Sequence, residues 1–200
     1  MRDMHMTKGR LEAFSDGVLA IIITIMVLEL KVPHGDDWAT LVKLWPVFVS
    51  YILSFIYVGI YWNNHHHLFA ASRRIDGTIM WANLHLLFWL SLVPFVTGWM
   101  GENHFTALPT ALYGFVLLMA AIAYWILQGR ILAGESTASA LRAQIGIDLK
   151  GKISPVLYIC GIATSFFVPW LAWALFAFVA LMWLVPDRRM ERAIGKGKAE

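Results

Sequence analysis

Two acidic residues, Glu12 and Asp16, stand at the start of an apolar segment that runs to Leu30. Placing a carboxylate at the centre of a membrane helix costs about 2.5–3.5 kcal/mol. Such carboxylates bind ions or transfer protons, or they form hydrogen bonds that hold a helix to its neighbours. The first apolar segment is therefore the candidate functional element. A purely structural, hydrogen-bonded carboxylate is the alternative interpretation of Asp16.

Three consecutive histidines, His65, His66 and His67, could bind a metal ion or sense pH. Consecutive helical residues point about 100° apart, so the three rings cannot all face one ion. A cluster at the membrane interface is the expectation, and no metal site or cofactor is predicted. The sequence contains no nucleotide-binding loop, H-E-x-x-H motif or G-x-S-x-G motif. We therefore do not expect an enzyme.

The composition places these residues in a membrane protein. Of the 200 residues 59% are hydrophobic and 14% are charged, against about 45–50% and about 25% in soluble domains. The net charge of +3 is small and its basic residues flank apolar segments, so nucleic acid is not an expected partner. We expect one all-α membrane domain, residues 1–200, with six transmembrane helices at residues 11–30, 44–62, 79–100, 107–127, 153–168 and 170–185.

The basic residues predict the orientation of these six helices. Of the 16 lysines and arginines, only Lys31 and Lys43 fall in loops on the side opposite the termini. Lysine and arginine concentrate on the cytoplasmic side of membrane proteins, so both termini are expected there. Trp62 is expected to anchor the end of the second helix at the interface. A short interfacial helix is expected between Gly134 and Gly151, from the spacing of Leu141, Ile145 and Leu149.

Helical periodicity sorts the first segment into two faces. At about 100° per residue, one stripe contains Ile21, Ile25 and Leu28, with the polar Thr24 at its edge. Asp16 and Glu12 point away from that stripe. Periodicity alone leaves packing in the protein core as the ordinary explanation of such a stripe.

Three sequence motifs give information that the helical periodicity does not. The first segment begins with the pattern R-x-x-x-F-S-D at Arg10, Phe14, Ser15 and Asp16. The run Y-W-N-N-H-H-H-L-F spans residues 61–69, and N-L-H-L-L-F-W-L-S-L-V-P-F spans residues 83–95. In these motifs and in all six expected helices, the chain resembles the prokaryotic branch of the transmembrane protein 175 family, relatives of the lysosomal potassium channel.

The resemblance implies a homotetramer of six-helix subunits in a prokaryotic inner membrane, with a pore lined by the first helix. It implies that Ile21, Ile25 and Leu28 narrow the pore, beside Thr24. It also implies that Arg10, Phe14, Ser15 and Asp16 belong to a structural polar network. We expect Trp62, Asn63 and His85 to join that network, and Glu29 to lie at the outer mouth.

The expected function is a potassium-permeable cation channel that interacts with monovalent cations, the bilayer and further copies of itself. Apolar rings can gate such a pore by dewetting. The sequence has no T-V-G-Y-G carbonyl filter, so only modest selectivity for potassium over sodium is expected. Two alternatives stay open: a proton-coupled transporter with Asp16 and His85 as a relay, and a non-conducting scaffold or sensor.

Overall fold

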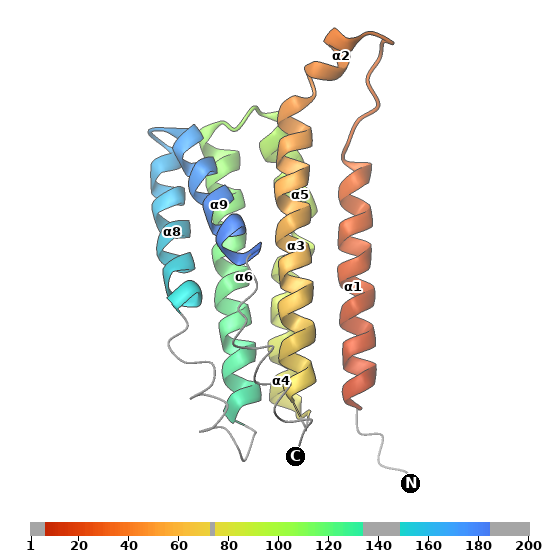
Figure 1. Ribbon diagram of the computed structural model, residues 1–200, viewed down its shortest axis with the longest axis vertical. Coiled ribbons are helices and arrows are strands. Elements are labelled where there is room, and N and C mark those ends of the chain that lie inside the picture. Colours follow the sequence, from red (N-terminus) through yellow and green to blue (C-terminus); the bar gives the residue numbers. More distant parts are fainter. Residues whose placement is uncertain (1–6, 73–74, 134–148, 185–200) are drawn as a thin grey trace.

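The computed structural model describes residues 7–72, 75–133 and 149–184, and these contain helices but no strand. The helices run alternately up and down the long axis of the molecule (Figure 1). They are α1 (Lys8–Leu28), α2 (Trp38–Val42), α3 (Trp45–Ala71), α4 (Gly77–Ser91), α5 (Val93–Glu102), α6 (Ala107–Ala133), α8 (Leu149–Ser165) and α9 (Pro169–Leu184). The expectation of an all-helical fold is confirmed for these residues.

Four segments are long and apolar enough to cross a bilayer: Lys8–Leu28, Trp45–Ala70, Gly77–Glu102 and Ala107–Ala133. The first has a mean hydropathy of 2.1, yet only 28% of it is buried within the protein. The apolar helix α9 is shorter. Several spanning helices in one chain make this a multi-pass integral membrane protein.

The helices are arranged from one edge of the molecule to the other (Figure 1). Helix α1 forms one edge and contacts α3, α4 and α5. The α8–α9 hairpin forms the opposite edge, where both helices pack on α6 and α9 also contacts α3. Because α1 contacts α3, α4 and α5 on one side, its other side is left uncovered by the helices that the structure describes.

Two helix boundaries differ from the expected spans because of proline. The third span, expected as one helix over residues 79–100, breaks at Leu92 into α4 and α5. Pro94 lies at the start of α5 and has no N–H to donate to the preceding turn, which explains the break. Pro169 is the first residue of α9 and not a spacer before it, since proline fits the first helical turn.

Three further helix boundaries also differ from those expected from the sequence. Helix α3 continues to Ala71, nine residues beyond the expected end at Trp62, so Trp62 does not mark a helix end. Helix α6 likewise continues to Ala133. Of the interfacial helix expected between residues 134 and 151, Leu141 and Ile145 lie outside the described residues, and Leu149 begins α8.

The hairpin is held to α6 by a close approach around Phe176 of α9, which is fully buried. A Cβ atom on Gly161 of α8 or on Gly114 of α6 would overlap the Phe176 ring. Gly161→Val is therefore expected to lower the free energy of unfolding by about 1–3 kcal/mol, the usual cost of overpacking. Chemical denaturation in detergent measures this. The matched control is Gly129→Ala, where nothing lies within 4 Å of the new Cβ, and a control that destabilises equally would contradict the explanation.

The start of α4 is capped by Asp76, whose Oδ1 accepts a hydrogen bond from the Ile79 backbone N–H at 2.8 Å. That bond, followed by one from the Thr78 hydroxyl, lowers the pKa of Asp76. A lowered folded pKa means that the cap stabilises the fold above the unfolded value of about 3.9 and is lost as pH falls through the folded value.

Asp76→Ala is therefore expected to lower the melting temperature by a few degrees at pH 7, and the difference from the unmodified protein is expected to shrink below about pH 4. Circular dichroism at both pH values measures this. Asp36→Ala, in an exposed part of the α1–α3 connection, is the control. A difference that stays constant with pH would show that the ionised cap is not responsible.

Candidate functional site

One face of α1 is not covered by residues 7–72, 75–133 or 149–184. On it lie five large apolar side chains, and their exposed fractions are 49% for Phe14, 58% for Ile21, 41% for Ile25, 46% for Val27 and 77% for Leu28. The opposite face is buried and consists of Leu11, Ser15, Leu19, Ile22 and Met26. The helix therefore has two apolar faces, and only one of them is used for packing within the protomer.

Thr24 lies on the exposed side between Ile21 and Ile25. Its hydroxyl donates to the backbone carbonyls of Ile21 at 2.9 Å and Ala20 at 3.1 Å. Since the hydroxyl proton is shared with the helix backbone, the oxygen lone pairs retain acceptor capacity. A threonine in this state can offer an oxygen to a cation but has no proton to offer an anion.

A buried chain of hydrogen bonds joins α1, α3 and α4. Asn83 Nδ2 of α4 donates to Ser15 Oγ of α1 at 2.9 Å, and Ser15 Oγ donates to the Leu11 carbonyl at 2.9 Å. Asn83 Oδ1 lies 2.8 Å from His65 Nε2 of α3. Because Oδ1 can only accept, His65 donates from Nε2. Ser15 and Asn83 are fully buried and His65 is 2% exposed, so this Ser15–Asn83–His65 network fixes the position of α1 against two helices.

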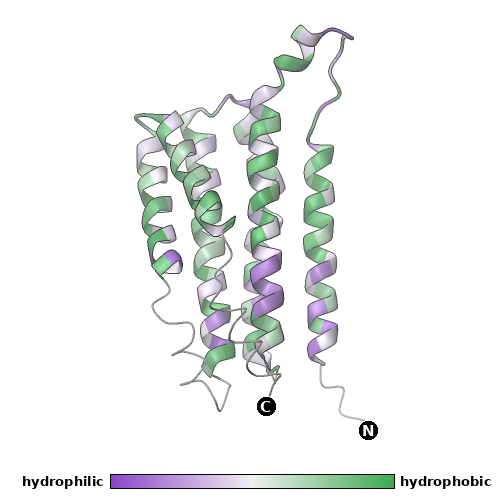
Figure 2. Ribbon diagram, viewed as in Figure 1, coloured by the Kyte–Doolittle hydropathy of each residue, from purple (hydrophilic) through white to green (hydrophobic). Residues whose placement is uncertain are grey.

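A second polar contact lies at the edge of the exposed face. Trp62 Nε1 of α3 donates to Asp16 Oδ1 at 3.1 Å, and both residues are exposed. The hydrophilic stretches of α1 and α3 lie at the same level of the molecule, toward the end where α1 begins (Figure 2). Asp16 therefore borders the uncovered face. The helical wheel had led us to expect Asp16 to be enclosed among the other described helices of its protomer, and this expectation is wrong.

Three residues expected in the network have other surroundings. His85 Nε2 accepts a hydrogen bond from Trp89 Nε1 at 2.9 Å, within α4. Asn63 and Arg10 are exposed, and within the described ranges neither forms a hydrogen bond or ion pair with another side chain. Arg10 is thus not paired with Asp16 or Glu12 in the protomer.

The sequence reasoning missed the central role of Asn83 and His65. Asn83 appeared only as the first residue of the third motif, and His65 was placed in a cluster at the membrane interface with its neighbours. A usable signal was present, since His65 lies four residues before Phe69, on which its ring stacks at a centroid distance of 4.3 Å. That spacing places His65 on the buried face of α3.

The other end of α1 is tied to α5. A Cβ atom on Gly98 would lie 3.1 Å from Glu29 Oε2, so Glu29 packs against α5. Lys31 Nζ lies 2.6 Å from Glu102 Oε1. The hydrogen bond to Glu102, then the charge of that carboxylate, raises the pKa of Lys31. Both acidic groups line an open cavity of about 340 Å³ between the ends of α1, α3 and α5.

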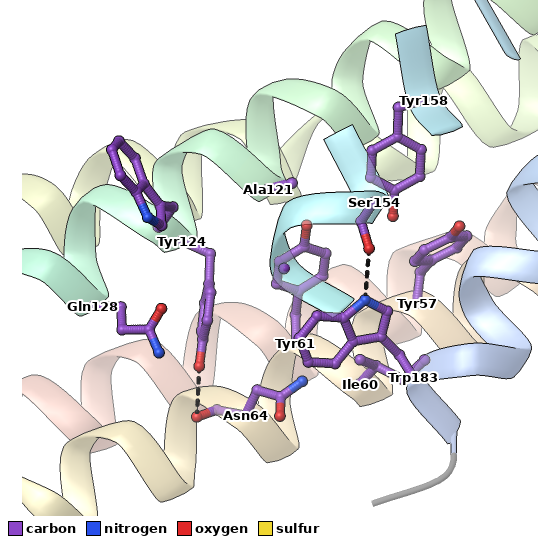
Figure 3. A pocket seen from close by; sticks show the side chains of 12 residues that line it. Tyr57, Ile60, Tyr61, Asn64, Ala121, Tyr124, Gln128, Ser154, Tyr158 and Trp183 are labelled. Carbon is purple, nitrogen blue, oxygen red and sulfur yellow. Dashed lines mark hydrogen bonds between the residues drawn. The ribbon is translucent and has the colours of Figure 1, made fainter. Parts of the chain in front are cut away.

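A smaller cavity of about 50 Å³ lies inside the protomer, between α3, α6, α8 and α9 (Figure 3). Its wall includes the tyrosines Tyr57, Tyr61, Tyr124 and Tyr158. Across it, Trp183 Nε1 donates to Ser154 Oγ at 2.9 Å. No acidic side chain is among its lining residues, and it lies away from the uncovered face of α1. It is not a candidate cation path.

The described residues contain no group of three or more histidine, cysteine or acidic side chains that could hold a metal ion. The candidate site is therefore the uncovered face of α1 with Thr24 and the neighbouring Asp16. One helix face cannot enclose a ligand. Such a face can form a site only where another protein surface completes it.

The chain is similar to known proteins over most of its length. The sequence model described as "Endosomal/lysosomal potassium channel TMEM175" matches residues 10–94. A potassium channel of Chryseobacterium sp. is 59% identical over 94% of this chain and 98% of its own length. A potassium channel of Chamaesiphon minutus is 33% identical over 82% and 87%. The mouse endosomal/lysosomal proton channel TMEM175 is 35% identical over 46% of this chain and 21% of its own length.

A solved structure shows the same fold. It is the crystal structure of a lysosomal potassium-selective channel TMEM175 homolog from Chamaesiphon minutus. It superimposes with a TM-score of 0.75 at 30% identity, covering 89% of this chain and 96% of that one. All the relatives cited here are named as ion channels, which confirms that the chain is not an enzyme. On the extent and identity of these matches, the chain is a member of the TMEM175 family.

Proposed function

We propose that this protein is a potassium-permeable cation channel formed by four identical subunits around a central pore. The uncovered face of α1 lines the pore, and Ile21, Ile25 and Leu28 narrow it. The observation that carries the proposal is the exposure of this face, because α1 packs on α3, α4 and α5 and its other apolar side has no partner in the described part of the chain.

The polar groups beside this face favour a pore over a lipid contact. Asp16 is an exposed carboxylate and Thr24 an exposed hydroxyl on a helix otherwise suited to the membrane. Ionisable side chains in membrane segments face bundle interiors or water-filled cavities because hydrocarbon does not solvate them. A water-filled path along α1 would hydrate Asp16 and Thr24.

The apolar side chains determine whether the proposed constriction contains water and conducts ions. From Ile21 to Leu28 the helix rises about 10 Å, so four copies would stack three apolar rings over that length. A narrow apolar constriction excludes water and closes the pore until it widens. Selectivity for potassium over sodium is modest in this proposal, because Thr24 hydroxyls are less numerous and less rigid than a carbonyl filter.

The subunit in this proposal has six crossings with both termini in the cytoplasm of a prokaryotic cell, in its inner membrane. The hairpin supports this: α8 and α9 run in opposite directions beside the four long segments (Figure 1). At 17 and 16 residues each would cover about 24–26 Å, which is close to the thickness of a bilayer core.

Purified protein in liposomes tests the proposal. Potassium efflux down a gradient is expected, together with a native mass of four subunits. Because the animal relatives are named proton channels, a pH-sensitive dye inside the liposomes measures proton entry in the same preparation. A protein that is folded and tetrameric yet passes neither ion would exclude the channel. The proton-coupled transporter is disfavoured because His85 bonds to Trp89 and is not joined to Asp16.

A further inference from the structure

The connection between α1 and α3 carries an exposed apolar surface, and of its side chains Trp45 also contacts Phe105 of the α5–α6 connection, at a ring-centroid distance of 5.7 Å. We call this surface the α2 tip and define it by Val32, Trp38, Leu41, Val42 and Trp45. The exposed fractions of these side chains are 81%, 80%, 39%, 61% and 55%. Trp38, Leu41, Val42 and Trp45 follow the spacing i, i+3, i+4, i+7, which places them on one side of a helical path.

The α2 tip has a defined conformation. Asp37 Oδ1 caps α2 by accepting a hydrogen bond from the Thr40 backbone N–H at 2.8 Å. Gly35 has a φ of 147°, and a Cβ there would lie 2.9 Å from Thr40 Oγ1. The backbone hydrogen bonds from Lys43 to Ala39 and from Leu44 to Leu41 continue the turn into α3. Large apolar groups held in this way present a fixed surface.

The position of the α2 tip indicates what covers it. Helix α2 lies beyond the ends of α1 and α3, at the edge of the molecule opposite the α8–α9 hairpin (Figure 1). If α1 lines a central pore, the α2 tip lies over the mouth of that pore, where the copies converge, and the hairpin faces the lipid. This step rests on the proposed function.

The charges around the α2 tip suit contact between identical copies. Asp36 and Asp37 directly precede Trp38, and Lys43 directly follows Val42, so both signs of charge are present in one short segment. Heterologous contacts repeated around a ring can place the acidic part of one copy beside the basic part of the next. A surface of one sign would instead repel its own copies.

We propose that the α2 tip of each subunit packs against the neighbouring subunit at the mouth of the pore. The contact ties the outer ends of the four pore helices together through apolar side chains. Lipid would then not touch Trp38, although Trp38 is among the most exposed large side chains of the isolated protomer.

Photo-crosslinking distinguishes a protein neighbour from lipid. The photoreactive residue p-benzoyl-phenylalanine replaces Trp38 in the full chain, which is irradiated in liposomes. A covalent dimer on a denaturing gel is the expected result, with the crosslinked peptide mapping to the neighbouring subunit. The matched control places the same residue at Phe167, which is 85% exposed between α8 and α9. There the expected products are lipid adducts and uncrosslinked monomer.

A second measurement does not depend on the photoreactive residue. Val42→Ser is expected to reduce the tetramer fraction in native mass measurements at low protein concentration, because it removes apolar area from the contact. Lipid adducts at position 38 with the tetramer and potassium flux intact would overturn the α2 contact and leave the channel standing. Monomers without flux in the unmodified protein would overturn both.

Discussion

Replacing Ile21 by asparagine is expected to increase potassium flux through the resting protein by about tenfold or more. Ile21 is 58% exposed on the uncovered face of α1, so the substitution leaves the protomer core unchanged. In the proposed tetramer it puts four amides into the constriction, and amides hold water where isoleucine excludes it. A fall of about 1.4 kcal/mol in the barrier is enough for a tenfold change in rate. Efflux from potassium-loaded liposomes measures the effect.

The control for this experiment is Ile159→Asn. Ile159 lies on α8 and is 55% exposed, so the change in chemistry and exposure is nearly the same, but the residue belongs to the hairpin at the other edge of the molecule. Flux through this variant is expected to match the unmodified protein. If both asparagine variants leak equally, the leak comes from general damage, and α1 is not the pore helix.

The grouping of the stripe residues on one face could be predicted from the helical period alone, but the exposure of that face could not, because the period is equally compatible with packing in the protein core. Residues 21, 25 and 28 share a face of any regular helix, and the residues that pack α1, such as Leu19 and Ile22, lie about 100–160° away on the same wheel. The all-helical fold could be predicted for a similar reason, since long apolar segments have few alternatives in a bilayer.

The contacts between helices could not be predicted in this way. The pairing of Ser15 with Asn83 and His65 depends on the relative heights and rotations of α1, α3 and α4, which no single segment encodes. The wheel placed Asp16 opposite the stripe; the contact of Trp62 with Asp16 was expected from the motifs and not from the wheel, and the structure has it at the edge of the uncovered face. The break at Leu92 was visible in Pro94, yet continuous hydropathy across it suggested one helix.

The position of the uncovered face of α1 depends on a polar anchor on the opposite side of the helix. Ser15 lies on the buried side of α1 within two turns of Ile21, and its only partner on another helix among the described residues is Asn83. If that anchor is lost, α1 keeps its apolar packing but loses the directional contact that sets its rotation. Hydrogen bonds specify one arrangement where apolar contacts tolerate several.

Asn83→Leu is expected to lower the free energy of unfolding of the protomer by about 2–4 kcal/mol. The leucine keeps most of the volume but leaves His65 Nε2 and the Ser15 hydroxyl without their partner, and each buried polar group left unsatisfied costs about 1–3 kcal/mol. The Ser15 cost is at the low end because its hydroxyl still donates to the Leu11 carbonyl. Chemical denaturation in detergent measures the loss, with Asn63→Leu as the control because Asn63 is exposed.

The double variant His65→Phe with Asn83→Leu separates the network from simple packing. Removing both polar partners leaves one fewer orphaned group, so the double variant is expected to recover about 1–2 kcal/mol relative to Asn83→Leu alone. Purely steric damage would instead make the two substitutions additive or worse. The double variant would still lack the directional contact to Ser15. Its potassium flux is therefore expected to differ from that of the unmodified protein even where its stability has returned. Restored stability with unchanged gating would show that apolar packing alone positions α1.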